Sequence, residues 1–200
     1  MDKSPKRSVE ANELQSTELP RLRIQIEPSL DYIGNLNSTV LDNAHIDNYY
    51  FIDKNADGQI QRILYFQFEG YLPDNNLSFD YPDMQSIAIN GHEFGYDGGV
   101  RMFKHLKIDE QPENSDVRQT VEFLKENDVR FSEGDFYGML RFAFMWDEAK
   151  RNDMLVIYLE RLEEADIPED IVAKSRHSGE WSVYCKQLLA RALRTFTICE

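Results

Sequence analysis

The chain of 200 residues is poor in cysteine, and its two cysteines, Cys185 and Cys199, form neither a CxxC pair nor a disulfide framework. We therefore expect two reduced thiols. The longest uninterrupted aliphatic or aromatic run, about Met154 to Leu159, is far shorter than the ~20 residues that span a bilayer. No apolar segment of a signal peptide follows the basic residues near the N-terminus. The sequence predicts a cytoplasmic protein.

Basic residues are also scarce, since 22 lysines and arginines stand against 36 aspartates and glutamates, for a net charge of −14 at pH 7. Such a chain repels phosphate backbones and anionic lipid heads, and no local basic patch is visible. We expect no nucleic-acid partner and no membrane partner. An acidic surface confers solubility and also suits a basic protein partner reached by electrostatic steering.

Common catalytic signatures are absent. The sequence has no phosphate-binding P-loop, no serine nucleophile elbow, no cysteine in basic surroundings and no internal repeat. Enzyme activity is thus unsupported by any motif, and no cofactor is expected.

What the chain has is a strong hairpin pattern between Ile46 and Glu69. The first segment ends in Tyr49-Tyr50-Phe51-Ile52, and the second alternates apolar and polar residues from Ile60 onward, except that Ile63 and Tyr65 stand on the otherwise polar side. Asp57-Gly58 between them is a typical turn, because glycine supplies the positive φ that the turn needs. We predict a long antiparallel hairpin at the centre of a sheet.

The connecting loop resembles the first half of a calcium-binding EF-hand loop. Asp53, Asn55 and Asp57 precede Gly58, but the twelfth position holds Leu64 instead of a bidentate carboxylate, and the flanks indicate strands. Asp, Asn and Gly are also the residues that a hairpin turn prefers. The turn is the favoured interpretation, and weak calcium binding stays open.

Residues 1–20 are mostly polar and predict a flexible tail before a single domain at 21–200. Alternation over 21–27 predicts the first strand, which Pro28 ends. The residues of 34–38 and 72–76 indicate turns, and 86–89 indicates another short strand.

The best candidate site is the glycine-rich segment 90–99, which holds His92, Glu93, Tyr96 and Asp97. Glycines allow close backbone approach to a ligand, and histidine is the one side-chain type whose free pKa lies near neutrality, so Glu93 or Asp97 could tune His92 as a catalytic acid or base. The spacing matches neither GxGxxG nor HExxH. A glycine-rich turn that leads into a strand is the alternative, and it is favoured.

A transition-metal site at the same place would need His92, Glu93 and Asp97 together with His45 or His105. No ligand spacing demands such a site. The sequence therefore predicts no metal.

From Asp109 onward helical periodicity replaces alternation. Ser115 or Asp116 can cap a helix that ends at Asn127-Asp128, and a capping box at 132–135 predicts a further helix to about Arg151. Its middle, 136–146, is almost entirely apolar and should be buried, although a strand is possible for part of it.

Arg141 is the one charged residue in that apolar run. It must reach solvent along its aliphatic stem, which is the favoured interpretation, or pair with an acid or with a ligand carboxylate. If Arg141 faces a pocket, it would bind an anionic small molecule.

The rest of the chain predicts a central strand at 154–159, a short helix opened by Pro168, a helix from Ser178 or Gly179 through Ala192, and a strand at 196–198. Strands cluster early and helices late. We therefore expect an α+β fold, in which an antiparallel sheet centred on the hairpin at 46–69 is packed by helices from the C-terminal half.

Two functions from different classes fit these observations. The first, preferred weakly, is a non-catalytic binding or interaction protein that holds a small ligand or a protein partner, with self-association as one form of the latter. The second is an acid and base enzyme on a small anionic substrate, with His92 as the base, Glu93 or Asp97 as its orienting group and Arg141 as the anion clamp.

Overall fold

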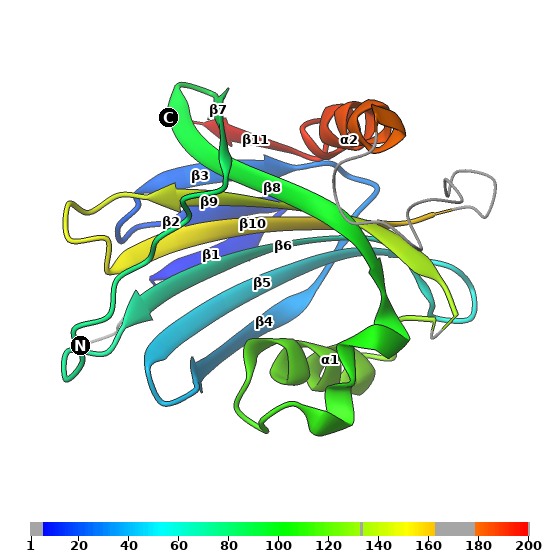
Figure 1. Cartoon of the computed structure of the whole chain (residues 1–200), viewed down its shortest axis with the longest axis horizontal. Helices are drawn as coiled ribbons and strands as arrows, with labels where there is room; N and C mark the ends of the chain where they lie inside the picture. Colours follow the sequence, from blue (N-terminus) through cyan, green and yellow to red (C-terminus); the bar gives the residue numbers. More distant parts are fainter. Residues whose placement is uncertain (1–5, 133, 163–178, 200) are drawn as a thin grey trace.

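The computed structural model describes residues 6–132, 134–162 and 179–199, whose strands form two antiparallel sheets (Figure 1). The small sheet has the order β1-β2-β3-β11, with the bounds Arg7–Glu10, Glu13–Ser16, Leu22–Ile26 and Phe196–Cys199. The large sheet has the order β4-β5-β6-β10-β9-β8-β7. In chain order β4 to β10 are Asp31–Val40, Ala44–Lys54, Ile60–Tyr71, Gln85–Ile89, His92–Met102, Phe136–Met145 and Asn152–Arg161.

The helices follow in the second half of the chain. Two 3₁₀ turns, η1 (Phe103–Leu106) and η2 (Ile108–Glu110), lead into α1 (Asp116–Glu126), and α2 (Gly179–Ala192) precedes β11. Ser115 caps α1, because its hydroxyl accepts the Arg118 N–H. Neither described helix is long and apolar enough to cross a membrane. The α+β class is confirmed in its coarse form, with antiparallel sheets as the dominant part.

The predicted hairpin is confirmed as β5 and β6, which pair over their whole length and lie inside the large sheet. The predicted strand at 154–159 is confirmed within β10, which pairs with β6 on one side and β9 on the other. Met154 and Val156 are completely buried there. A strand covered on both faces is apolar at successive positions, which explains the continuous run in the sequence.

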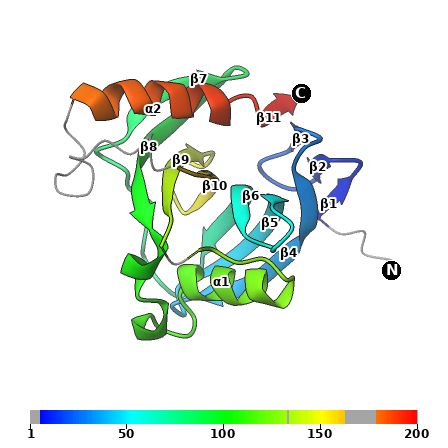
Figure 2. The same ribbon diagram turned by 90° about the vertical axis from the view of Figure 1, so that its right-hand side faces the viewer.

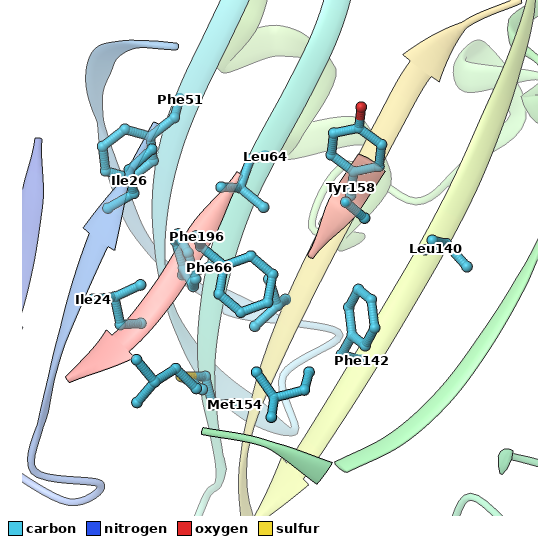
Figure 3. Close-up of a cluster of buried hydrophobic side chains, with 14 of the residues drawn as sticks. Ile24, Ile26, Phe51, Leu64, Phe66, Leu140, Phe142, Met154, Tyr158 and Phe196 are labelled. Atoms are coloured by element: carbon cyan, nitrogen blue, oxygen red, sulfur yellow. The ribbon is translucent and has the colours of Figure 1, made fainter. Parts of the chain in front are cut away.

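The main core lies between the two sheets. Figure 3 shows Ile24 and Ile26 of β3 and Phe196 of β11 beside Phe66 and Phe142 of the large sheet. The Phe196 ring meets those of Phe66 and Phe142 edge-on, with centroids 5.9 and 6.1 Å away. Burying one such ring contributes roughly 1.5–3 kcal/mol, so these contacts hold the small sheet on the large one.

We call the face of the large sheet that carries Phe66 and Phe142 the outer face, and the face that carries Tyr65 and Arg141 the inner face. The large sheet curves around α1, which lies on its inner side, while α2 lies on the opposite side (Figure 2). On the inner face Leu124 of α1 packs in the cluster of Ile52 and Ile63. The curved sheet and α1 together border the space described below.

Two predictions differ from the structure, and a third is not tested by it. The helix predicted at about 132–151 is wrong, because 136–145 form β9 between β8 and β10, and a strand whose two faces are both covered is apolar at successive positions. The turn predicted at 34–38 is wrong, because it lies inside β4, where only the irregular pairing near Gly34 marks a bulge. The short helix predicted after Pro168 lies outside the described residues.

Within the stretch 1–20, expected as a flexible tail, the structure has β1 and β2. Leu14 of β2 is completely buried in the main core and pairs with Ile24 of β3. Leu14, with Val9 packed beside it, ties this mostly polar segment to the core, which composition alone does not indicate. The division into a tail and one domain at 21–200 stays a prediction.

Candidate functional site

The predicted site residues of β8 fall on both faces of the large sheet, because successive side chains of a strand point in opposite directions. Tyr96 packs against the core of the outer face, where the His92 ring also lies edge-on to Phe144, with centroids 5.3 Å apart. Asp97 and Glu93 belong to the inner face. The segment 90–99 is thus a turn at Asn90-Gly91 followed by a strand, which is the favoured alternative of the sequence analysis.

His92, Glu93 and Asp97 are therefore not brought together. Glu93 is exposed and accepts a hydrogen bond of 2.9 Å from the Ser86 hydroxyl of β7. Tyr96 donates to Gln85 over 2.8 Å. Neither carboxylate lies on the face of β8 that carries the imidazole.

The structure does bring Asp97 and Arg141 together. They are direct partners across β8 and β9, and the guanidinium donates twice to the carboxylate, from Nη2 to Oδ2 over 2.7 Å and from Nε to Oδ1 over 3.2 Å. Burial works against the charge of Arg141, but the hydrogen bond and the charge of Asp97 raise its pKa. Arg141 thus pairs with an acid of its own chain, which was one of the predicted arrangements.

This ion pair lies in a row of side chains across the inner face. Tyr50, Tyr65, Ile157, Arg141 and Asp97 come from β5, β6, β10, β9 and β8, and each is the direct partner of the next. The Tyr50 and Tyr65 rings lie 5.2 Å apart, and Arg141 lies 5.4 Å from the centroid of Tyr81.

Beside this row, under α1 and η1, lies a cavity of about 180 Å³. Of its thirteen lining residues nine have apolar side chains, among them Ile63, Phe103, Val117, Val121, Met139 and Ile157. The polar ones are Tyr65, Arg101, Thr120 and Tyr137. No carboxylate belongs to the described lining. A concave, mainly apolar space with a few polar groups is the usual form of a small-molecule site.

At least three of the four polar lining groups are already engaged. The Thr120 hydroxyl shares a hydrogen bond of 2.9 Å with the Tyr50 hydroxyl. The Tyr137 hydroxyl accepts the Ser132 N–H over 3.2 Å and lies 3.5 Å from the Ile60 carbonyl oxygen. Arg101 Nη1 donates to the Val100 carbonyl oxygen over 3.2 Å.

A second polar cluster lies at the other end of the inner face. Asp153 of β10 is completely buried, accepts a hydrogen bond of 2.5 Å from the Tyr81 hydroxyl and stands opposite Glu69 of β6. Burial raises the pKa of Asp153 to about 7 and also raises that of Glu69. The second carboxylate oxygen of Asp153 has no hydrogen-bond partner in the described part of the chain.

Tyr81 belongs to the segment 72–84, which joins β6 to β7 and must pass β10, β9 and β8 to do so. We call it the strap. Arg151 holds it by donating to the carbonyl oxygens of Leu72, Asn75 and Leu77, at 2.6 to 2.9 Å. The inner face is thus covered by α1 at one end and by the strap at the other.

The sequence analysis missed the cavity, although one signal was present. Ile63 and Tyr65 are the two apolar residues on the otherwise polar side of the second hairpin segment, and both line the cavity. Apolar residues on both sides of a strand indicate cover on both faces.

No group of three or more His, Cys, Asp or Glu side chains is close enough to hold a metal ion among the described residues. His45 shares a hydrogen bond of 3.1 Å with Thr39 on β4, away from β8. In the loop that resembles a calcium site, Asn55 Oδ1 accepts the N–H groups of Asp57 and Gln59, at 3.0 and 2.9 Å. This oxygen stabilises the hairpin turn.

Comparisons with family models, with curated proteins and with solved structures found no match for the chain.

Proposed function

We propose that this chain is a non-catalytic binding protein that holds a small, mainly apolar ligand in the cavity between α1 and the inner face of the large sheet. The observation that carries the proposal is the cavity of about 180 Å³ with its largely hydrocarbon lining. A buried apolar cavity of about 150 Å³ is enough to bind benzene or xenon. The natural ligand is therefore about the size of one ring with a few substituents.

The acid and base mechanism is not part of this proposal. It would need His92 and a carboxylate within about 3 Å of one substrate proton, directly or through one water. His92 and Glu93 point to opposite faces of β8, and Asp97 is engaged by Arg141. The cytoplasmic location and a protein partner or self-association stay predictions.

The proposal is tested with benzene and xenon as probes. Both are expected to raise the melting temperature and to shift the NMR methyl signals of Val117, Val121 and Met139, because a ligand that binds only the folded state stabilises it. Methyl groups of the main core, such as those of Ile24, should not move.

Filling the cavity supplies the matched control. Val117→Phe places a ring in the cavity and should abolish the response, whereas Val9→Phe, also at a half-buried valine but packed against the main core, should leave it intact. The proposal fails if neither probe binds the native chain, or if Val117→Phe binds benzene as the native chain does.

A further inference from the structure

The strap consists of two parts, which are held to the large sheet in different ways. Residues 72–79 are anchored through their backbone. Arg151 donates to three of their carbonyl oxygens, and the Phe79 N–H donates to the Lys150 carbonyl oxygen over 2.7 Å. We call the second part, residues 80–84, the latch. It is mostly exposed and belongs to no strand.

The latch is held mainly by side chains. Among the described residues, its single hydrogen bond to the rest of the chain is the one from the Tyr81 hydroxyl to Asp153. Tyr81 and Met84 also pack on Ala143 and Leu155 of the inner face. The latch can therefore open without the loss of any strand pairing, which is the usual form of a local opening of low cost.

The carboxylate beneath the latch is in surroundings that oppose its charge. Asp153 is completely buried, one of its oxygens has no partner among the described residues, and Glu69 of β6 stands directly opposite. Burial without full hydrogen bonding and a like charge nearby both disfavour an ionised carboxylate. The closed latch is thus compatible with a protonated Asp153 and much less so with an ionised one.

The other titratable groups that face Asp153 do not relieve it. Tyr71 of β6 stays neutral, because burial raises its pKa further above 10. Arg141 of β9 is held by Asp97 of β8 in two hydrogen bonds, and Arg151, 5.9 Å from the Tyr71 ring centroid, is held by the strap carbonyl oxygens. Access to water is therefore what an ionised Asp153 gains when the latch opens.

We propose that the latch is a pH-sensitive cover of the inner face, which is closed while Asp153 carries a proton and opens more often as Asp153 ionises. Opening brings Asp153 and Glu69 into contact with water. It also removes one wall of a hollow of about 340 Å³, which is lined by Tyr81 and Met84 on one side and by β7, β8 and β9 on the other.

The direction of the effect follows from where the proton is held. Burial raises the pKa of Asp153 to about 7 in the closed form, whereas in water the carboxyl has its ordinary value of 3.8. Opening therefore releases a proton, so the open fraction rises with pH up to about pH 7 and levels off above it. From pH 5 to pH 8 the rise is up to about a hundredfold, because each pH unit below the pKa of the closed form contributes a factor of about ten.

Thiol labelling measures the opening. In a chain with Cys185→Ala and Cys199→Ser, Ala143→Cys places one thiol beneath the latch, and dithiodipyridine reacts with it when the latch is open. Ser86→Cys, at an exposed residue of β7, gives the rate of an uncovered thiol at each pH. Ala192→Cys, at a completely buried residue of α2, gives the rate that global unfolding alone allows.

We expect the rate of Ala143→Cys, divided by that of Ser86→Cys, to rise by about 30-fold to a hundredfold from pH 5 to pH 8. At both pH values Ala143→Cys should react faster than Ala192→Cys. Asp153→Asn, which has no proton to release, should abolish the rise. Tyr81→Phe should raise the rate roughly fivefold to tenfold at both pH values, because the latch loses its hydrogen bond, and should keep the rise.

Three outcomes overturn the inference: a rate ratio that is the same at pH 5 and pH 8, an equal rise in Asp153→Asn, or labelling of Ala143→Cys no faster than that of Ala192→Cys. None of them bears on the proposed function, which the benzene and xenon experiments test separately.

Discussion

At the scale of single residues, Asp153 is a carboxylate of the inner face in unfavourable surroundings. It is buried, it faces Glu69 across the β6–β10 pair, and one of its oxygens has no partner among the described residues. Like charges directly opposite each other in a sheet are destabilising. The structure tolerates the pair most easily when Asp153 carries a proton.

This arrangement predicts an unusual dependence of stability on pH. The pKa of Asp153 is raised from 3.8 to about 7 in the folded chain, so between about pH 4 and pH 7 the folded state keeps a proton that the unfolded state releases. The free energy of unfolding should therefore fall as pH rises through this window and level off above it, by up to about 4 kcal/mol. The raised pKa of Glu69 acts in the same direction.

Asp153→Asn should remove most of this dependence. The amide oxygen can still accept from Tyr81, the amide nitrogen can donate toward Glu69, and the variant should be more stable than the native chain at pH 8. Urea unfolding at pH 5 and pH 8 measures the difference, with the exposed Asp57→Asn as the control. Equal pH slopes in the native chain and in Asp153→Asn would contradict the assignment.

At the scale of elements, β1 and β2 are the strands that the sequence predicts least well. Their sequence is mostly polar, and only Leu14 of β2 is completely buried. Leu14→Ala should lower the free energy of unfolding by about 2–5 kcal/mol, because the packed core leaves a cavity in place of the side chain. In a flexible tail the same change would have almost no effect.

The control is Leu77→Ala, at a leucine that is 45% exposed in the strap. It should change the unfolding free energy by no more than about 0.5 kcal/mol. Equal effects of the two substitutions in a denaturant titration would show that β1 and β2 do not pack on the core in solution.

The predictability of each element follows from how many of its faces are covered. The β5–β6 hairpin and α1 could be predicted, because alternation, a turn with Gly58 and the Ser115 cap are local signals. The strand β9 could not, because apolar residues on both faces remove the period that separates a strand from a buried helix. The sequence analysis favoured an Arg141 that reaches solvent, and it gave pairing with an acid, which the structure shows with Asp97, only as an alternative.

The candidate site was harder to predict from the sequence than the strands, because it depends on contacts between distant segments. Tyr65 and Val117 line one cavity although more than fifty positions separate them in the sequence. His92 and Glu93 are adjacent in the sequence and lie on opposite faces. Spacing along the chain indicated a cluster at 90–99, and strand alternation then separated its members.

At the scale of the whole molecule, the strand that completes the centre of the large sheet comes late in the sequence. The strand β6 ends at Tyr71, and its partner β10 is completed only at Arg161, after β7, β8, β9 and α1. A fragment of residues 1–151 lacks β10, α2 and β11 and leaves the edge of β6 without its partner. We expect this fragment to be unfolded or aggregated, and a dispersed NMR spectrum of it would contradict the expectation.

The same pairing has a consequence during protein synthesis. About 90 residues must be added after β6 before β10 is complete, which takes a ribosome roughly 5 to 18 s at the usual rates of elongation. For that time the side chains of Tyr65, Phe66 and Phe68 lack their cover from β10, on a nascent chain whose β6 edge can pair with another copy. The nascent chain should therefore depend on chaperones in the interval between these two strands, and on them much less once β10 has emerged.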